Sequence, residues 1–312
     1  MYKLYMSCLL TFGLLATGHG PAHAESSEII VGVLEHHKGL VLEYHKELLT
    51  GDPFYFTVRV MFKKTEGEWQ SFESDCMTRT CLRTIASQFP SKVRWTIAFD
   101  GKNLGQVPTV KPREFKYRSS VGEQDIVHGS KIPTIGKPSQ EFNGWVVEDV
   151  YRPLVAVSHP HYKDPDHWKP SHPEDKLVQL TRAEFRKQFP TVTNCDKEDP
   201  SRSQPWPYAD SDIKILKSYS SNKHWLLLQL SLEGSECEML DDNSPFMGQW
   251  FTVSPEQDVS HLGEAMMLID AGDYDDDGRS EVMFKTHGYN RGGYKLFYKD
   301  FSESVSFEFG FH

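Results

Sequence analysis

Short apolar segments separated by turn residues recur along the whole chain. They are rich in Val, Ile, Phe, Tyr and Trp, the side chains that favour β-strands. Residues that favour tight turns lie between several of them, at Asp100-Gly101, at Glu66-Gly67 and at 256–258. The pattern predicts strands at residues 29–34, 56–62, 93–99, 145–147, 154–157, 213–219, 225–232, 250–253, 265–270, 281–286 and 305–309.

Helical patterns are few. The clearest covers residues 182–189, where Thr181 and Glu184 fit a capping box and Pro190 ends the helix. Residues 40–49 form a second candidate, for which a strand is the alternative. The chain is therefore expected to be all-β with few short helices.

Two long stretches, residues 102–143 and 159–173, are rich in polar and turn-forming side chains and are expected to be loops. Loops of this length in a compact β domain tend to be functional or to cover a sheet edge. Neither stretch is poor enough in apolar residues to mark a domain boundary. Residues 25–312 are therefore expected to form a single β-rich domain.

The first 24 residues have the features of a secretory signal peptide. Lys3 precedes an apolar stretch at residues 8–16, and Ala22-His23-Ala24 supplies the small residues of a cleavage site. Cleavage is expected after Ala24. No later stretch reaches the 18 or so apolar residues that a membrane span needs. The expected protein is exported, periplasmic or secreted, and soluble, with no membrane span.

The formal net charge of −10 argues against a nucleic-acid partner. Binding to a polyanion depends on clustered Lys and Arg, whereas the basic residues of this chain are scattered between acidic ones.

Four cysteines lie beyond the leader, and an even number in an exported chain indicates two disulfides. Three pairings are possible, of which Cys76 with Cys81 and Cys195 with Cys237 is favoured. Two residues five apart on one α-helix would be too far apart to bridge. A helix there is thus expected to start near Leu82 and to end before Pro90. Free thiols are the alternative, and no Cys-x-x-Cys pair indicates zinc.

Carboxylates are concentrated at residues 273–281. Asp273, Asp275, Asp277 and Glu281 hold positions 1, 3, 5 and 9 of a loop, and Gly278 at position 6 can adopt positive φ. Converging carboxylates repel one another unless a cation lies between them, and calcium prefers such oxygen ligands. The loop is not an EF-hand, because the glutamate required at position 12 is replaced by Phe284. A solvated acidic turn is the alternative.

Residues 268–298, which include this loop, resemble one FG-GAP or VCBS-type repeat. An apolar strand is followed by the acidic loop, a second strand, a Gly/Asn turn at 289–294 and an aromatic strand. The resemblance implies a blade of a β-propeller with a structural calcium ion. It assigns the ligands to Asp273, Asp275, Asp277, the Arg279 carbonyl and Glu281. Glu281 departs from the more usual Asp, and only one copy is present, so a β-sandwich that carries the same loop is the alternative fold.

The histidine-rich segment 159–172 is the other group of metal-ligand residue types. Its spacing fits no known metal motif, and an exposed loop is the expected structure. No nucleophile, phosphate-binding or dinucleotide motif occurs. The expected function is a binding or interaction module for a protein or glycan, with a structural calcium ion. The alternative is an extracytoplasmic hydrolase with a loop-built cleft, which a pocket of convergent titratable groups would favour.

Overall fold

The computed structural model describes residues 28–38, 54–142, 149–194, 204–234 and 244–311, and the chain there is mainly β, as predicted. Two α-helices occur in this part, α1 (Arg79–Ala86) and α2 (Asp175–Gln188). The strands are β1 (Ile29–Lys38), β2 (Phe54–Thr65), β3 (Glu68–Ser71), β4 (Lys92–Phe99), β5 (Lys102–Val110), β6 (Glu123–Ile126), β7 (Leu154–Val157), β8 (Lys169–Pro170), β9 (Val192–Asn194), β10 (Gln204–Trp206), β11 (Ile213–Ser220), β12 (Leu226–Leu232), β13 (Gln249–Val253), β14 (Val259–Glu264), β15 (Met266–Gly272), β16 (Glu281–Gly288), β17 (Arg291–Tyr298) and β18 (Glu303–Gly310).

Six of these strands close into a barrel, in the order β1-β7-β4-β5-β6-β2, because β2 also pairs with β1. The strand register places Leu34, Val58 and Ile97 on one face of its sheet, and all three are buried, as the alternation of apolar positions requires. The register of β1 and β2 shifts between Val31 and Gly32, and an added Cβ at Gly32 would lie 2.5 Å from the carbonyl oxygen of Arg59. This close approach requires glycine and places Arg59 at the barrel wall beside β1.

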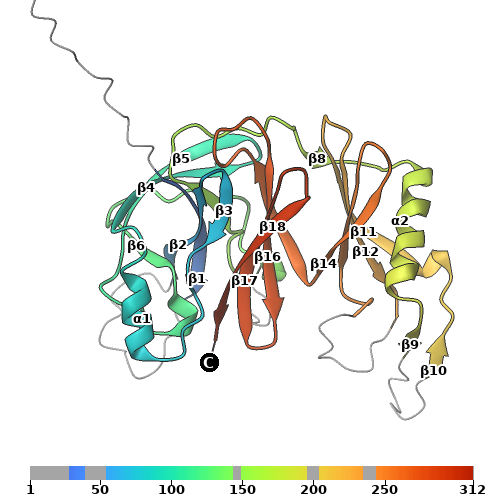
Figure 1. Cartoon of the computed structure of the whole chain (residues 1–312), viewed down its shortest axis with the longest axis horizontal. Helices are drawn as coiled ribbons and strands as arrows, with labels where there is room; N and C mark the ends of the chain where they lie inside the picture. Colours follow the sequence, from blue (N-terminus) through green and yellow to red (C-terminus); the bar gives the residue numbers. More distant parts are fainter. Residues whose placement is uncertain (1–27, 39–53, 143–148, 195–203, 235–243, 312) are drawn as a thin grey trace, which may run out of the picture.

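The strands β15 to β18 form a four-stranded antiparallel meander that lies between the barrel and a five-stranded sheet of order β14-β13-β12-β11-β8 (Figure 1). Both faces of this middle sheet are buried. Met283 and Leu296 pack with the barrel core, whereas Phe284 packs with Trp250 of the five-stranded sheet. This explains the uninterrupted apolar runs at residues 282–284 of β16 and 296–298 of β17.

Helix α2 covers the far side of the five-stranded sheet through Phe185, which is fully buried with Phe251 (Figure 1). The helix begins at Asp175 and not at the predicted residue 182. Thr181 is buried inside it and donates its hydroxyl to the Leu177 carbonyl oxygen at 2.8 Å, so it is not an N-cap. The capping-box pattern at Thr181 was therefore misleading.

The predicted hairpin turns are confirmed. Asp100 and Gly101 have φ of 50° and 69° between β4 and β5, and Glu66 and Gly67 have φ of 54° and 85° between β2 and β3. Such left-handed pairs match the twist of the flanking strands. The predicted loop at 102–143 was wrong, because β5 and β6 lie within it. The predicted elements at 40–49 and 145–147 lie outside the described residues.

Cys76 and Cys81 form the predicted disulfide, with their Cα atoms 5.6 Å apart. Helix α1 begins at Arg79, three residues before the predicted start, and Thr78 caps it by accepting the Cys81 amide at 3.2 Å. Cys76 lies outside the helix, which makes the bridge possible. Cys195 and Cys237 lie outside the described residues, as does the leader at residues 1–24.

Within the described ranges, the sheets form a barrel and two stacked antiparallel layers, and no ring of propeller blades is present. None of the helices found there has the length and apolar character that crossing a membrane requires.

Candidate functional site

Ionisable side chains converge at two places in the described part of the chain. The first is the acidic loop, residues 273–281, which joins β15 to β16. The second is a pocket between one side of the barrel and the β16–β17 end of the middle sheet, called the barrel pocket below. The two places differ in how the chain builds them.

In the acidic loop, left-handed residues fold the carboxylates inward. Asp276 has a φ of 62° and Gly278 a φ of 86°. Carboxylate oxygens of Asp273, Asp275 and Glu281 lie within 4.8 Å of one another, and all three residues are buried. Three of the five predicted ligand residues therefore come together.

Backbone amides hold these carboxylates in place. The amides of Asp277 and Gly278 donate to the two oxygens of Asp273 at 3.0 and 2.9 Å, and the Tyr274 amide donates to Glu281 Oε2 at 2.8 Å. The side chain of Asp277, another predicted ligand, is 41% exposed and lies outside the group of three. The Arg279 amide donates to it at 2.9 Å.

The loop concentrates negative charge in a poorly solvated place. Burial raises the pKa of Glu281 well above its usual range, and the charges of Asp275 and Asp277 add to this. Burial also raises the pKa of Asp275, although Lys64 opposes the effect. A divalent cation would relieve the repulsion, and a donor set made only of oxygens suits a hard cation. The residues present therefore fit a hard cation, and calcium stays the prediction.

Two lysines supply positive charge at the loop. Lys64, from barrel strand β2, donates to Asp275 and lies 3.4 Å from Asp277 Oδ2. The Lys163 ammonium lies 3.7 Å from Asp273 Oδ2. The contact of Lys64 with Asp275 spans 211 positions of the chain, so no local pattern reveals it. It connects the barrel to the middle sheet.

The histidine-rich segment packs against the acidic loop. Asp164 accepts the Ser280 hydroxyl at 2.6 Å, and His159 Nε2 lies 2.9 Å from the Tyr274 carbonyl oxygen. Asp164 and Asp166 are buried, whereas the histidines at 161, 167 and 172 are exposed. The expectation of an exposed loop holds for those histidines but not for the two aspartates, which brace the acidic loop.

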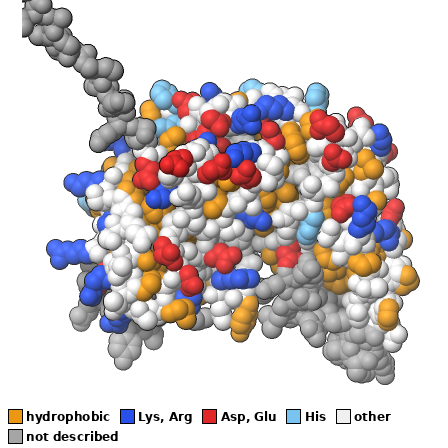
Figure 2. All heavy atoms as spheres, viewed as in Figure 1, with side chains coloured by type: hydrophobic (Ala, Val, Ile, Leu, Met, Phe, Trp, Pro, Cys, Tyr) orange, Lys and Arg blue, Asp and Glu red, His pale blue; other side chains and the backbone are white. Residues whose placement is uncertain are grey.

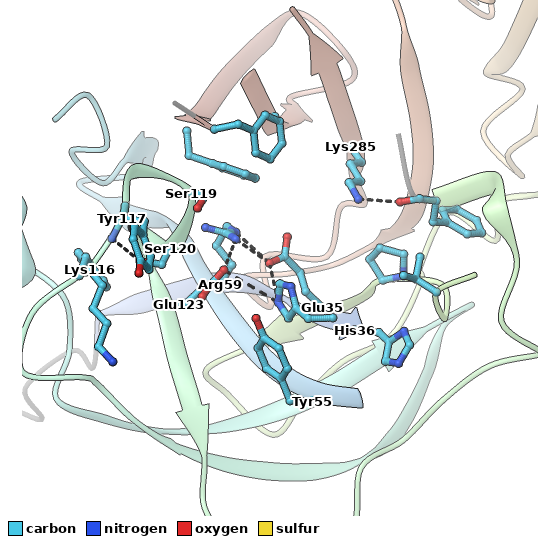
Figure 3. A pocket seen from close by; sticks show the side chains of 18 of the residues that line it. Glu35, His36, Tyr55, Arg59, Lys116, Tyr117, Ser119, Ser120, Glu123 and Lys285 are labelled. Carbon is cyan, nitrogen blue, oxygen red and sulfur yellow. Dashed lines mark hydrogen bonds and ion pairs between the residues drawn. The ribbon is translucent and has the colours of Figure 1, made fainter. Parts of the chain in front are cut away.

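The barrel pocket has a volume of about 1000 Å³. Its floor is an ionic network centred on Arg59, whose side chain is 2% exposed (Figure 3). Arg59 donates to Glu35 Oε2 at 3.0 Å, to Glu123 Oε1 at 2.6 Å and to the Val121 carbonyl oxygen at 2.6 Å. From the middle sheet, Tyr294 donates to Glu35 Oε1 at 2.7 Å. The network therefore joins β1, β2, β6 and β17.

This network separates the pKa values of its two carboxyl groups. Burial alone would raise the pKa of Glu35, but the charges of Arg59 and His37 outweigh it and bring the pKa to about 2. For Glu123 burial prevails over Arg59, and the pKa rises to about 7. Oxygen and nitrogen atoms of Glu35, His37 and Glu123 also lie within 4.8 Å of one another. Arg59 already supplies the cation there.

Strand β16 contributes two further polar side chains to the pocket. Lys285 donates to the Phe142 carbonyl oxygen at 2.7 Å, and burial lowers its pKa (Figure 3). Burial also lowers the pKa of His287 to about 4, so its ring is neutral at pH 7. Its Nε2 atom is buried and has no hydrogen-bond partner within the described ranges.

Exposed aromatic side chains surround this polar floor. Tyr55, Tyr117, Tyr289 and Phe311 are 51%, 69%, 65% and 49% exposed, and all four line the pocket. No other Phe, Tyr or Trp is this exposed among the residues whose burial the structure describes. The hairpin predicted at 289–294 is present, with exposed Asn290 at its turn. Its role in a pocket was missed, because the lining comes from residues 35 to 311.

No known family model, curated protein or solved structure matches the chain. Function must therefore be inferred from the acidic loop and the barrel pocket themselves.

Proposed function

We propose that this chain is an exported, calcium-stabilised β-protein that binds a ligand in the barrel pocket. The observation that carries the proposal is the pocket itself, where four exposed aromatic side chains surround a buried ionic floor. Exposed apolar groups are costly on a protein surface, and their concentration around one cavity is typical of a binding site. The volume of about 1000 Å³ is sufficient for a small molecule or a short polymer segment.

The acidic loop supports the calcium part of this proposal. Its three convergent carboxylates and its fixed backbone amides match what the FG-GAP or VCBS-type resemblance implies for residues 268–298. The four-stranded meander β15 to β18 also has the strand number of one propeller blade. In this proposal the ion holds the middle sheet in shape, and that sheet forms one wall of the pocket.

A protein or glycan partner fits this picture better than nucleic acid does. On the face shown in Figure 2, Lys and Arg side chains are interspersed with Asp and Glu, and no broad basic area is visible. Binding to a polyanion needs such an area.

The experiment is a thermal-unfolding screen of the purified chain against five compound classes: neutral oligosaccharides, amino acids, nucleotides, fatty acids and polyamines. We expect at least one class to raise the unfolding midpoint, because a ligand that binds only the folded state stabilises it. The shift is expected to shrink in the Tyr117→Ala, Tyr289→Ala double variant. A shift of the same size in that variant, or no shift with any class, would contradict a binding role for the pocket.

A hydrolase is the second candidate, because the carboxyl oxygens of Glu35 and Glu123 lie within 4.8 Å and their pKa values are about 2 and about 7. At pH 7 Glu35 is ionised and Glu123 is about half protonated, and a pair of carboxyl groups with separated pKa values is typical of a nucleophile and a general acid. Binding is favoured over hydrolysis because Arg59 already bridges both groups. Turnover of nitrophenyl glycosides that is lost in Glu123→Gln would reverse this preference.

A further inference from the structure

The class of ligand can be inferred from the balance of charge in the barrel pocket. Four carboxylates and three cationic side chains line it in the described part of the chain, so neither sign dominates. Arg59 neutralises much of the Glu35 and Glu123 charge, and Glu114 is paired at 2.9 Å with Arg83. A strongly charged ligand would meet repulsion from one of these groups whichever its sign. The pocket is therefore better suited to a neutral ligand.

The polar groups of the floor are fixed in place, and they include both hydrogen-bond donors and hydrogen-bond acceptors. The carboxyl group of Glu123 is held at Arg59 through one oxygen, and its second oxygen can make a hydrogen bond to a ligand. Lys285, which makes one 2.7 Å hydrogen bond to the Phe142 carbonyl oxygen, retains two further donors. His287 Nε2 is buried with no partner among the described residues. Neighbouring hydroxyl groups satisfy such a mixture, because each donates and accepts.

The rim requires an apolar surface on the same ligand. Tyr117 lies in the connection between β5 and β6 of the barrel, next to the short 3₁₀ helix Arg118–Ser120, and Tyr289 lies at the β16–β17 turn of the middle sheet. Their rings are 69% and 65% exposed and are available for stacking. A pyranose ring has apolar C–H faces and a periphery of hydroxyl groups, so it can contact aromatic rings and a polar floor together.

We propose that the barrel pocket binds a neutral carbohydrate, with a sugar ring stacked on Tyr117 or Tyr289 and its hydroxyl groups directed to Glu123, Lys285 and His287. This proposal rests on the proposed binding function and names its ligand class. A short oligosaccharide fits the pocket volume of about 1000 Å³.

The test is isothermal titration of the purified chain with neutral trisaccharides of glucose, xylose and N-acetylglucosamine. An anionic galacturonate trimer and tetramethylammonium serve as charged probes. We expect at least one neutral sugar to bind, with affinity reduced about three- to tenfold by Tyr289→Ala or Tyr117→Ala. Tyr289→Phe should retain affinity, because stacking needs only the ring. Leu216→Ala, at an exposed apolar position of β11 outside the pocket lining, is the matched control and should change nothing.

The outcomes distinguish the two proposals. Binding of a charged probe alone, lost in the tyrosine variants, would overturn the carbohydrate class and keep the pocket as a binding site. Binding of no probe, or sugar binding that the tyrosine variants leave intact, would overturn the carbohydrate proposal and also count against the pocket.

Discussion

The acidic loop and the barrel pocket both gather carboxylates, but the chain builds them in opposite ways. In the acidic loop the three convergent carboxylates lie within nine consecutive residues, and turn geometry alone brings them together. In the pocket floor, Glu35 and Glu123 come from strands β1 and β6 and meet because β2 pairs with both of these strands. The first is a local structure, and the second depends on pairing between strands that are far apart in the chain.

The positive charges that balance the carboxylates also differ between the two places. Arg59 is almost completely buried and makes three hydrogen bonds of 3.0 Å or less, so the pocket floor is complete without any added ion. At the acidic loop, Lys64 is 17% exposed and its contacts reach Asp275 and Asp277 but not all three convergent carboxylates. Substitutions at the two places should therefore have different consequences.

The largest expected effect is at Arg59. Arg59→Met removes the partner of two buried carboxylates, and the loss of one partner of a buried ion pair costs about 3–5 kcal/mol of unfolding free energy. Denaturant unfolding measures the loss. The matched control is Arg83→Met, whose pair with Glu114 has side chains 71% and 49% exposed and should contribute about 1 kcal/mol or less. Equal losses in the two variants would refute the idea that the pocket floor depends on Arg59.

The second effect separates the acidic loop from the pocket. Asp275→Ala should lower stability more in calcium than in EDTA, by about 2.7 kcal/mol when calcium is a hundredfold above its dissociation constant. A smaller loss in EDTA reflects the Lys64 contact. Thermal or denaturant unfolding in both buffers measures the difference. Asp276→Ala is the control, because this neighbour is 49% exposed and is not a predicted ligand. Equal losses for Asp275→Ala in the two buffers would contradict a structural ion.

The same contrast explains how far the sequence could be used for prediction. The hairpin turns and the Cys76–Cys81 bridge were predictable, because each depends on residues close together in the chain. The convergence of Asp273, Asp275 and Glu281 followed from their spacing for the same reason. Calcium itself stays a prediction.

Barrel closure and the pocket were not predictable. Strand β6 reads Glu-Gln-Asp-Ile, and its inward residue is Gln124, which is buried and donates to the Pro90 carbonyl oxygen at 2.8 Å. A polar inward residue hides the alternation that marks a strand. Strand β5 contains Gly105 and Pro108, which usually indicate a loop. With both strands hidden, Glu123 could not be assigned to a site.

The stability of the folded chain should depend on pH through Glu123 in the pocket floor. Burial raises the pKa of Glu123 from 4.5 to about 7 in the folded chain. Between these values the folded chain holds a proton that the unfolded chain has lost, so this group makes stability fall as pH rises. Glu123→Gln removes the effect, and its stability relative to the original chain should rise from pH 5 to 7, by at most about 1.4 kcal/mol per pH unit.

Denaturant unfolding at pH 5, 6 and 7 measures this slope. The pKa of His37, lowered to about 4 mainly by burial, makes stability rise with pH up to its unfolded value of 6.5. This contribution is present in both proteins and cancels in the comparison. Parallel pH profiles for the two proteins would show that Glu123 stays ionised across this range.

The smallest expected effect is at Lys64, and it tests whether the acidic loop has a built-in competitor for its ion. The ammonium contacts Asp275 and lies 3.4 Å from Asp277, so a bound cation must share or displace it. Lys64→Met should therefore raise calcium affinity about fivefold, which corresponds to about 1 kcal/mol. The control is Lys63→Met, because this neighbour pairs with Glu28 at 3.4 Å and does not contact the loop. Titration calorimetry with calcium on both variants measures the two affinities. An unchanged affinity in Lys64→Met would mean that the ion and the ammonium occupy the loop together. A lower affinity would mean that Lys64 orients the ligands.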